Sequence, residues 1–153
     1  MDYRELISKF AESCGLDGSQ VFDENGVASI RADDTTLSFV ELPPTRQIVT
    51  LAPVADKPAD DGGRLYETLL AAQYLGRLTE GASFSLSPEG QIVLYRRDAL
   101  AELDVAAFAE VVEGFLNLVD EWRGVIGAYR PDAPRTVEEP PPEGDGNFHF
   151  IQV

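Results

Sequence analysis

The sequence predicts an α+β fold in which a mainly antiparallel sheet is covered by helices. Residues 82–87 and 91–95 are rich in β-branched and aromatic side chains, as strands are. The four residues Ser87-Pro88-Glu89-Gly90 between them suit a type I turn. A long helix follows, with Asp104 as its expected N-cap. Its apolar residues recur at alternating spacings of three and four: Val105, Phe108, Val112, Phe115, Val119, Trp122 and Ile126. Such a stripe has to lie against a partner, and the neighbouring hairpin offers a sheet.

Length and charge limit the possible classes. A chain of 153 residues predicts one domain, large enough to bury a core. It carries 27 acidic against 12 basic side chains, an excess that repels nucleic acid and anionic membranes. Cys14 is the only cysteine, so no intrachain disulfide can form, and a reducing compartment is expected. The sequence contains neither an apolar run of the roughly 18 residues that span a membrane nor a signal peptide. We therefore expect a cytoplasmic protein.

The chain is expected to open with a helix that ends at Gly15. Its apolar face is short: Tyr3, Leu6, Ile7, Phe10 and Cys14. We therefore expect this helix to be only lightly held by the rest of the domain. Cys14 belongs to the apolar face, which favours a small buried side chain over a nucleophile, because no base accompanies it.

Three strands are expected next, at residues 27–32, 36–42 and 46–52. The turn Asp33-Asp34 separates the first two, and Pro43-Pro44 ends the second. Short turns between strands predict an antiparallel meander with one covered face and one more open face. The following segment, residues 54–63, is polar and is expected to be a surface loop. Its aspartates lack the spacing of a calcium loop, so we expect no metal site.

The second helix is expected at residues 64–78 and is apolar on nearly all sides. A helix of that kind is buried on both sides, so we expect a second copy of the chain to pack on it. The interface would involve Tyr66, Leu69, Leu70, Gln73 and Tyr74. The alternative is that other parts of the same chain cover this helix.

The composition changes near residue 130, which divides the chain into a domain at 1–129 and an acidic, proline-rich tail at 130–153. The tail ends in Phe148-His149-Phe150-Ile151-Gln152-Val153, which alternates like a strand. Apolar residues at the end of a solvated tail favour docking on an open sheet edge. The sequence therefore raises the hypothesis that this segment fills a client-type site. The alternative is a frayed end.

The predicted order is α-β-β-β-α-β-β-α. The chain resembles the class I type III secretion chaperones in three features. These are the order of elements, the excess of acidic side chains and the segment "LGRLTEGASFSLSPEGQIVLYRRDALAELDVAAFAEVVEGFLNLVDEW". The resemblance covers residues 1–127. It implies a small cytoplasmic homodimer that works without ATP, metal or cofactor. It also implies a client, the N-terminal region of a cognate effector, which is bound in extended form and kept ready for export. The proline-rich tail departs from the family pattern.

An extended client offers apolar side chains and unpaired backbone groups. We expect the first helix to lie over the meander and leave an apolar hollow for those side chains. The hollow would be lined by Leu6, Ile7, Phe10, Ile30, Phe39 and Leu51. On the sequence alone, Phe10→Asp is expected to abolish client capture and leave the fold intact.

The sequence leaves two alternatives to a chaperone. An enzyme is disfavoured because His149 is the only histidine and the nucleotide, hydrolase and zinc motifs are absent from the sequence. The other alternative is an adaptor or regulatory dimer with the same fold and no link to secretion. Co-purification of one effector segment would distinguish a chaperone from an enzyme.

Overall fold

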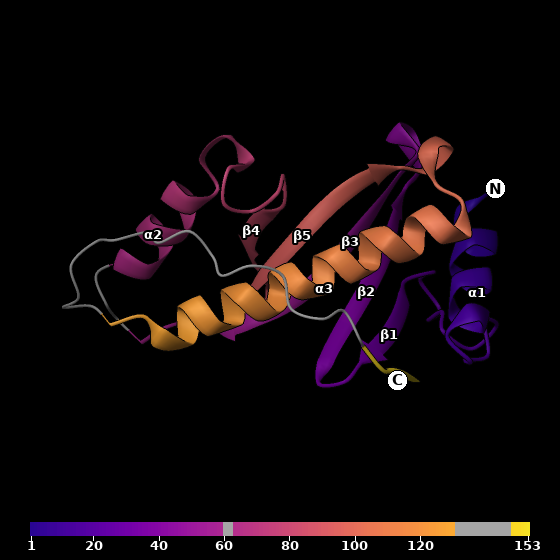
Figure 1. Cartoon of the computed structure of the whole chain (residues 1–153), viewed down its shortest axis with the longest axis horizontal. Helices are drawn as coiled ribbons and strands as arrows, with labels where there is room; N and C mark the ends of the chain where they lie inside the picture. Colours follow the sequence, from indigo (N-terminus) through magenta and orange to yellow (C-terminus); the bar gives the residue numbers. More distant parts are fainter. Residues whose placement is uncertain (60–62, 131–147) are drawn as a thin grey trace.

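A computed structural model describes residues 1–59, 63–130 and 148–153 of the chain (Figure 1). The elements follow the predicted order, with one further strand at the end. They are α1 (Tyr3–Ser13), β1 (Ala28–Ala32), β2 (Thr35–Leu42), β3 (Gln47–Asp56), α2 (Arg64–Ala72), β4 (Ser83–Leu86), β5 (Gln91–Ala99), α3 (Val105–Ala128) and β6 (Phe150–Gln152). Three short 3₁₀ turns join them: η1 (Pro43–Thr45), η2 (Tyr74–Gly76) and η3 (Leu100–Glu102).

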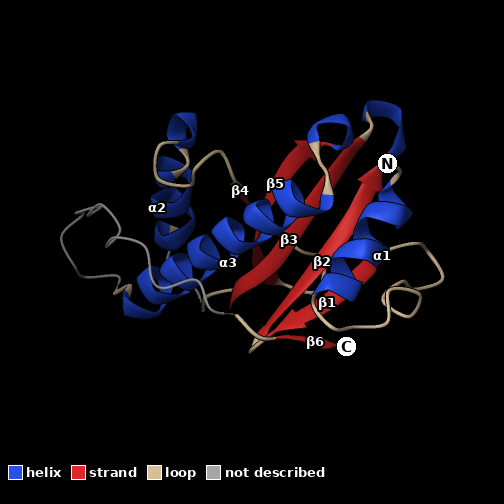
Figure 2. Cartoon of the chain, turned by 45° about the vertical axis from the view of Figure 1, so that its right-hand side comes forward, coloured by secondary structure: helices blue, strands red, loops and turns tan. Residues whose placement is uncertain are grey.

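The strands form one six-stranded sheet in the order β4-β5-β3-β2-β1-β6, and neighbouring strands are antiparallel. In Figure 2, α3 runs across one face of the sheet and α1 lies beside it over β1 and β2. Residues on that face are buried, including Ile30, Leu37 and Ile48. Their alternate neighbours, such as Val40 and Val49, are only partly buried. The predicted α+β class, the meander and its single covered face are therefore confirmed.

The hairpin and the long helix form where the sequence predicts them, although β5 runs four residues further, to Ala99. The amide of Gly90 donates to the carbonyl of Ser87 at 2.9 Å, which closes the expected turn between β4 and β5. Asp104 caps α3 by accepting a hydrogen bond from the amide of Ala107 at 2.8 Å. The centre of the apolar stripe of α3 is buried against the sheet, from Phe108 through Trp122. At its far end, the Trp122 ring meets Phe84 of β4 edge to face, with centroids 5.0 Å apart.

The second helix is shorter than predicted. It ends at Ala72 instead of reaching Leu78, and a 3₁₀ turn follows. The chain turns there because Leu75 adopts a left-handed conformation with φ 55°, and Gly76 follows with φ 68°. A left-handed residue cannot continue a right-handed helix, and this conformation is uncommon outside glycine. Helical periodicity in the sequence does not reveal such a residue.

The third strand is longer than predicted and runs past Pro53 to Asp56. Its pairing with β2 stops at Leu51, whereas its pairing with β5 continues through an irregularity between Pro53 and Ala55. Proline cannot donate to a ladder, but beyond Leu51 the strand has a partner on one side only. The proline is therefore tolerated here, and the predicted loop at residues 54–63 begins later. Asp60 and Asp61 of that loop lie outside the described residues.

Candidate functional site

Three phenylalanine rings from distant parts of the sequence meet at the centre of the domain. Phe10 of α1 lies edge to face against Phe108 of α3, with ring centroids 5.1 Å apart. Phe39 of β2 lies 5.4 Å from Phe108 and 6.2 Å from Phe10. All three are at most 1% exposed. These rings, called the aromatic cluster below, join helix α1 to the sheet and to α3.

The structure places the predicted client-binding residues in two different environments. Five of them are fully buried in the core: Leu6, Ile7, Phe10, Ile30 and Phe39. Leu51 pairs with Ser38 and Tyr95 on the opposite face of the sheet and is half-buried. The side chains of α1 themselves fill the space in which a hollow was expected. Phe10→Asp would bury a charge among apolar rings and unfold the domain, so this variant is not a selective test of binding.

Helix α1 is held more firmly than its short apolar face suggests. The Tyr3 hydroxyl donates a hydrogen bond to the backbone carbonyl of Phe39 at 2.7 Å. Burial raises the pKa of the Tyr3 hydroxyl to about 12. Asp2 caps the start of the helix by accepting from the amide of Glu5 at 2.8 Å. Helix α1 is therefore anchored by polar contacts as well as by the apolar face that the sequence predicts.

The outer edge of β1 carries the end of the chain itself. Strand β6 pairs antiparallel with β1 and places Gln152 opposite Ile30, Ile151 opposite Arg31 and Phe150 opposite Ala32 (Figure 2). The ring of Phe150 lies edge to face against Phe10, with centroids 5.9 Å apart, and so adds a fourth ring to the aromatic cluster. The predicted alternation holds, because Phe148 and Phe150 are partly buried whereas Ile151 is exposed. The proline-rich segment 131–147 before it lies outside the described residues.

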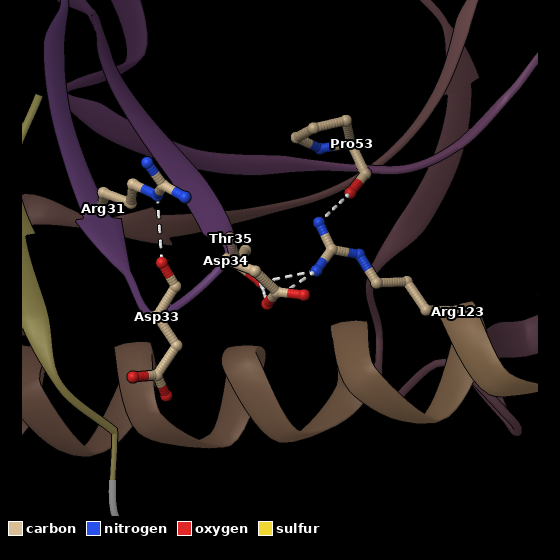
Figure 3. A network of polar contacts seen from close by, with 6 residues as sticks. All are labelled: Arg31, Asp33, Asp34, Thr35, Pro53 and Arg123. Carbon is tan, nitrogen blue, oxygen red and sulfur yellow. Dashed lines mark hydrogen bonds and ion pairs between the residues drawn. The ribbon is translucent and has the colours of Figure 1, made fainter.

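Two arginines contact the turn between β1 and β2, next to which β6 docks (Figure 3). Nε of Arg31 donates to the Asp33 carbonyl at 2.9 Å, and Arg123 reaches the turn from α3. Nη1 of Arg123, on α3, donates to the buried Thr35 hydroxyl at 2.7 Å, and Nη2 donates to the Pro53 carbonyl at 3.0 Å. Its contact with Asp34 is longer, at 3.4 Å, and the Asp34 side chain is 85% exposed. In the same turn, the amide of Asp33 donates to the carbonyl of His149 at 2.7 Å. Arg123 therefore fixes the turn mainly through its two contacts with Thr35 and Pro53.

Replacing Arg123 with methionine is expected to lower the free energy of unfolding by about 1–3 kcal/mol. The variant keeps most of the apolar stem but leaves the Thr35 hydroxyl and the Pro53 carbonyl without their charged donor. Asp34→Ala, the control, should change stability by less than about 0.5 kcal/mol, since an exposed ion pair contributes little. Urea denaturation followed by circular dichroism measures both. Equal losses of unfolding free energy in the two variants would contradict the conclusion that Arg123 acts mainly through Thr35 and Pro53.

A second surface lies on α2 and the turn after it. Leu70, Tyr74 and Leu75 are 61%, 67% and 80% exposed, which is unusual for large apolar side chains so close together. The sequence placed Leu75 inside a helix and therefore missed it as part of this surface. Together these three residues are called the α2 patch below.

The other predicted interface residues make contacts within the chain. Leu69 is buried in the core, and the Gln73 side chain accepts a hydrogen bond from the amide of Phe84 at 2.7 Å. Tyr66 is half-buried, and its hydroxyl has no hydrogen-bond partner within the described part of the chain. Helix α2 is therefore packed on one side by its own chain and open on the other.

The environment of Cys14 does not favour a reactive thiol. Burial raises the pKa of its thiol, which disfavours the reactive thiolate. Within residues 1–59, 63–130 and 148–153, no three histidine, cysteine or acidic side chains gather in a way that could hold a metal ion. In the same ranges, no helix combines the length and apolar character needed to cross a bilayer.

Comparison with known proteins identifies the family of the chain. Residues 5–123, from the first turn of α1 nearly to the end of α3, match the Tir chaperone protein (CesT) family. The chain belongs to the Tir chaperone protein (CesT) family. This membership confirms the resemblance to the class I type III secretion chaperones, which are a class of chaperones and not of enzymes. The chain is also 26% identical over 124 residues to the protein CPj0713/CpB0740 of Chlamydia pneumoniae. That alignment covers 80% of this chain and 95% of the relative.

Solved complexes contain chains with the same fold as this CesT-family member. A chain of the ExsC–ExsE complex has a TM-score of 0.64 and 21% identity, covering 82% of this chain and 96% of that one. A chain of the HopA1–SchA chaperone–effector complex has a TM-score of 0.59 and 20% identity, covering 80% and 93%. The complex of the Yersinia pestis type III secretion chaperone SycH with a stable fragment of YscM2 gives 0.57 and 15%, covering 77% and 97%.

Proposed function

We propose that this chain is an ATP-independent type III secretion chaperone of the cytoplasm. It binds the N-terminal region of a cognate effector in extended form, as a homodimer, and keeps that effector competent for export. The observation that carries the proposal is the family match, because it spans the whole body of the domain from α1 to α3. The similar chains in chaperone–effector complexes support an effector as the partner.

The surfaces of the chain suit this task physically. An edge strand presents unpaired amide and carbonyl groups, which an extended polypeptide can satisfy by adding a strand. A segment whose backbone is already paired within a folded domain cannot add in this way, so strand addition favours an unfolded segment. Binding of that kind needs no bond cleavage and no nucleotide, which agrees with the missing nucleotide-binding motifs in the sequence.

The α2 patch supports the homodimer. Three exposed apolar side chains lose contact with water when two copies pack face to face, at about 25 cal/mol for each Å² buried. A dimer would present two client sites to one effector segment, and a second contact on the same segment raises the overall affinity. The net charge of −15 disfavours non-specific association, so apolar contacts have to hold the copies together.

Co-purification tests the proposal. A tagged chain is co-produced with the full-length secreted protein encoded beside it, and the washes contain a chelator and an ATP-hydrolysing enzyme. The effector should remain bound through these washes, and limited proteolysis of the complex should leave its N-terminal region protected. Loss of the effector on removal of nucleotide or metal would contradict the proposed mechanism, and so would protection of another region.

A further inference from the structure

Strand β6 differs from the other five strands in how it is attached. Strands β1 to β5 are joined to one another by turns or by α2, and all of them lie within the part of the chain that matches the family. Strand β6 follows residues 131–147 and lies beyond that part. Only three of its residues pair with β1. It can therefore leave the sheet without breaking the pairing of any other strand. The edge of β1 would then be open at residues 30–32, beyond Ala28 and Ser29, whose outer edge Val21 and Phe22 already occupy.

The contacts of β6 are those that an extended client would make. Its backbone pairs with β1 and, just before the strand, the His149 carbonyl accepts from the amide of Asp33 at the turn. One side of it faces inward, where the Phe150 ring meets Phe10 at 5.9 Å, and the other side exposes Ile151. Strand addition draws affinity from the backbone and specificity from alternate side chains. Both components are present at this edge.

We propose that the β1 edge is the strand-docking site for the client and that β6 is a tethered competitor which occupies it in the free chaperone. The inference rests on the proposed function for the identity of the client. The client is an extended segment in which an aromatic or large apolar side chain takes the place of Phe150 against the aromatic cluster. An incoming segment has to displace β6, because antiparallel pairing to β1 uses the same backbone groups.

Tethering sets the strength of this competition. A segment held on the same chain acts at an effective concentration in the millimolar range, so a strand of three residues can compete although it binds weakly. If β6 fills the edge in about nine molecules out of ten, the apparent affinity for any external strand falls about tenfold. Bound β6 keeps the edge of β1 covered until a client arrives. This protects the free chaperone, because uncovered strand edges promote aggregation.

The test uses full-length variants that release β6. Ile151→Pro removes an amide hydrogen from the strand, and Phe150→Asp places a charge where the ring meets Phe10. Ile151→Thr is the matched control, because it changes the same exposed side chain and keeps the amide. The probe is a fluorescein-labelled peptide, Phe-His-Phe-Ile-Gln-Val, with the sequence of residues 148–153. Fluorescence anisotropy gives its affinity for each protein, and circular dichroism checks that each protein is folded.

The Ile151→Pro and Phe150→Asp proteins should bind the peptide about tenfold more tightly than the wild type and the Ile151→Thr protein. Equal affinity for all four proteins, or no binding to any, would overturn the proposal. A merely structural strand would give lower melting temperatures in the first two variants without any gain in peptide binding, and this outcome also counts against it.

A second arm keeps this inference separate from the proposed function. The N-terminal effector segment should also bind the Ile151→Pro protein about tenfold more tightly than the wild type. An unchanged effector affinity together with a gain for the peptide would show that the client binds elsewhere, and would overturn the client part of the inference. If no protein captures the effector, the proposed function fails, whereas the peptide result still decides whether β6 competes for the β1 edge.

Discussion

Leu70→Asp is expected to convert the proposed dimer into a folded monomer. Leu70 is 61% exposed in the single chain, so an aspartate there remains hydrated as long as the copies are apart. Association would bury this charge without a partner, at a cost on the order of 3–5 kcal/mol. That cost corresponds to a weakening of the dimer by about a hundredfold or more. Light scattering coupled to size exclusion measures the mass, and circular dichroism reports whether the monomer is folded.

Val125→Asp is the matched control for this experiment. Val125 is also an exposed apolar residue on a helix, but it lies on α3 outside the α2 patch. The control should keep the mass of the wild type. If the wild type is already a monomer, or if both aspartate variants dissociate equally, the α2 patch is not the interface.

Phe108→Ala is expected to lower the free energy of unfolding by about 3–5 kcal/mol, because it removes a fully buried ring and leaves a cavity. Phe108 contacts the rings of both Phe10 and Phe39, so its loss loosens α1, the sheet and α3 together. With a urea dependence of about 2 kcal/mol per M, the unfolding midpoint should fall by roughly 2 M.

Leu75→Ala serves as the comparison, since it removes a large apolar side chain that is 80% exposed. Measured at protein concentrations at which the chain is monomeric, it should move the midpoint by less than about 0.3 M, because little buried surface is lost. A Phe108→Ala protein as stable as the Leu75→Ala protein would contradict the assignment of the aromatic cluster as the centre of the core.

The sequence was sufficient where local patterns determine the structure. The stripe of α3 and its cap Asp104 depend on spacing and on one side-chain hydrogen bond within four residues. The β4–β5 turn depends on proline and glycine within four positions. The alternation in residues 148–153 likewise indicated which side of β6 faces inward. These features are local, so the sequence specifies them without knowledge of the tertiary structure.

The errors arose where contacts distant in the sequence decide the structure. The anchoring of α1 includes a hydrogen bond from Tyr3 to a carbonyl 36 positions further along the chain, which the sequence does not indicate. The end of α2 depends on one left-handed residue, Leu75, for which apolar periodicity gives no sign. Leu51 was grouped with Phe39, although the register of β2 and β3 places them on opposite faces. A shift of one residue in register reverses the face, and the sequence did not fix it here.

The candidate site was predicted only in outline. The sequence indicated both an apolar helix at α2 and a strand-like end at β6, but it placed the client in a hollow that Phe10 and its neighbours fill. Leu69 and Gln73 contact their own chain in the structure. Leu70 and Tyr74 are therefore the predicted interface residues that remain exposed. Arg123 gave no signal in the sequence, because its partners Thr35 and Pro53 lie on two other elements.

Calorimetric titration of this chain with two fragments of the same effector tests the central claim most directly. One fragment is the N-terminal segment in unfolded form, and the other is the folded remainder. The account predicts that the N-terminal segment binds, with one segment for each chaperone dimer, and that the remainder does not bind. Binding of the folded remainder alone, or of neither fragment, would contradict it.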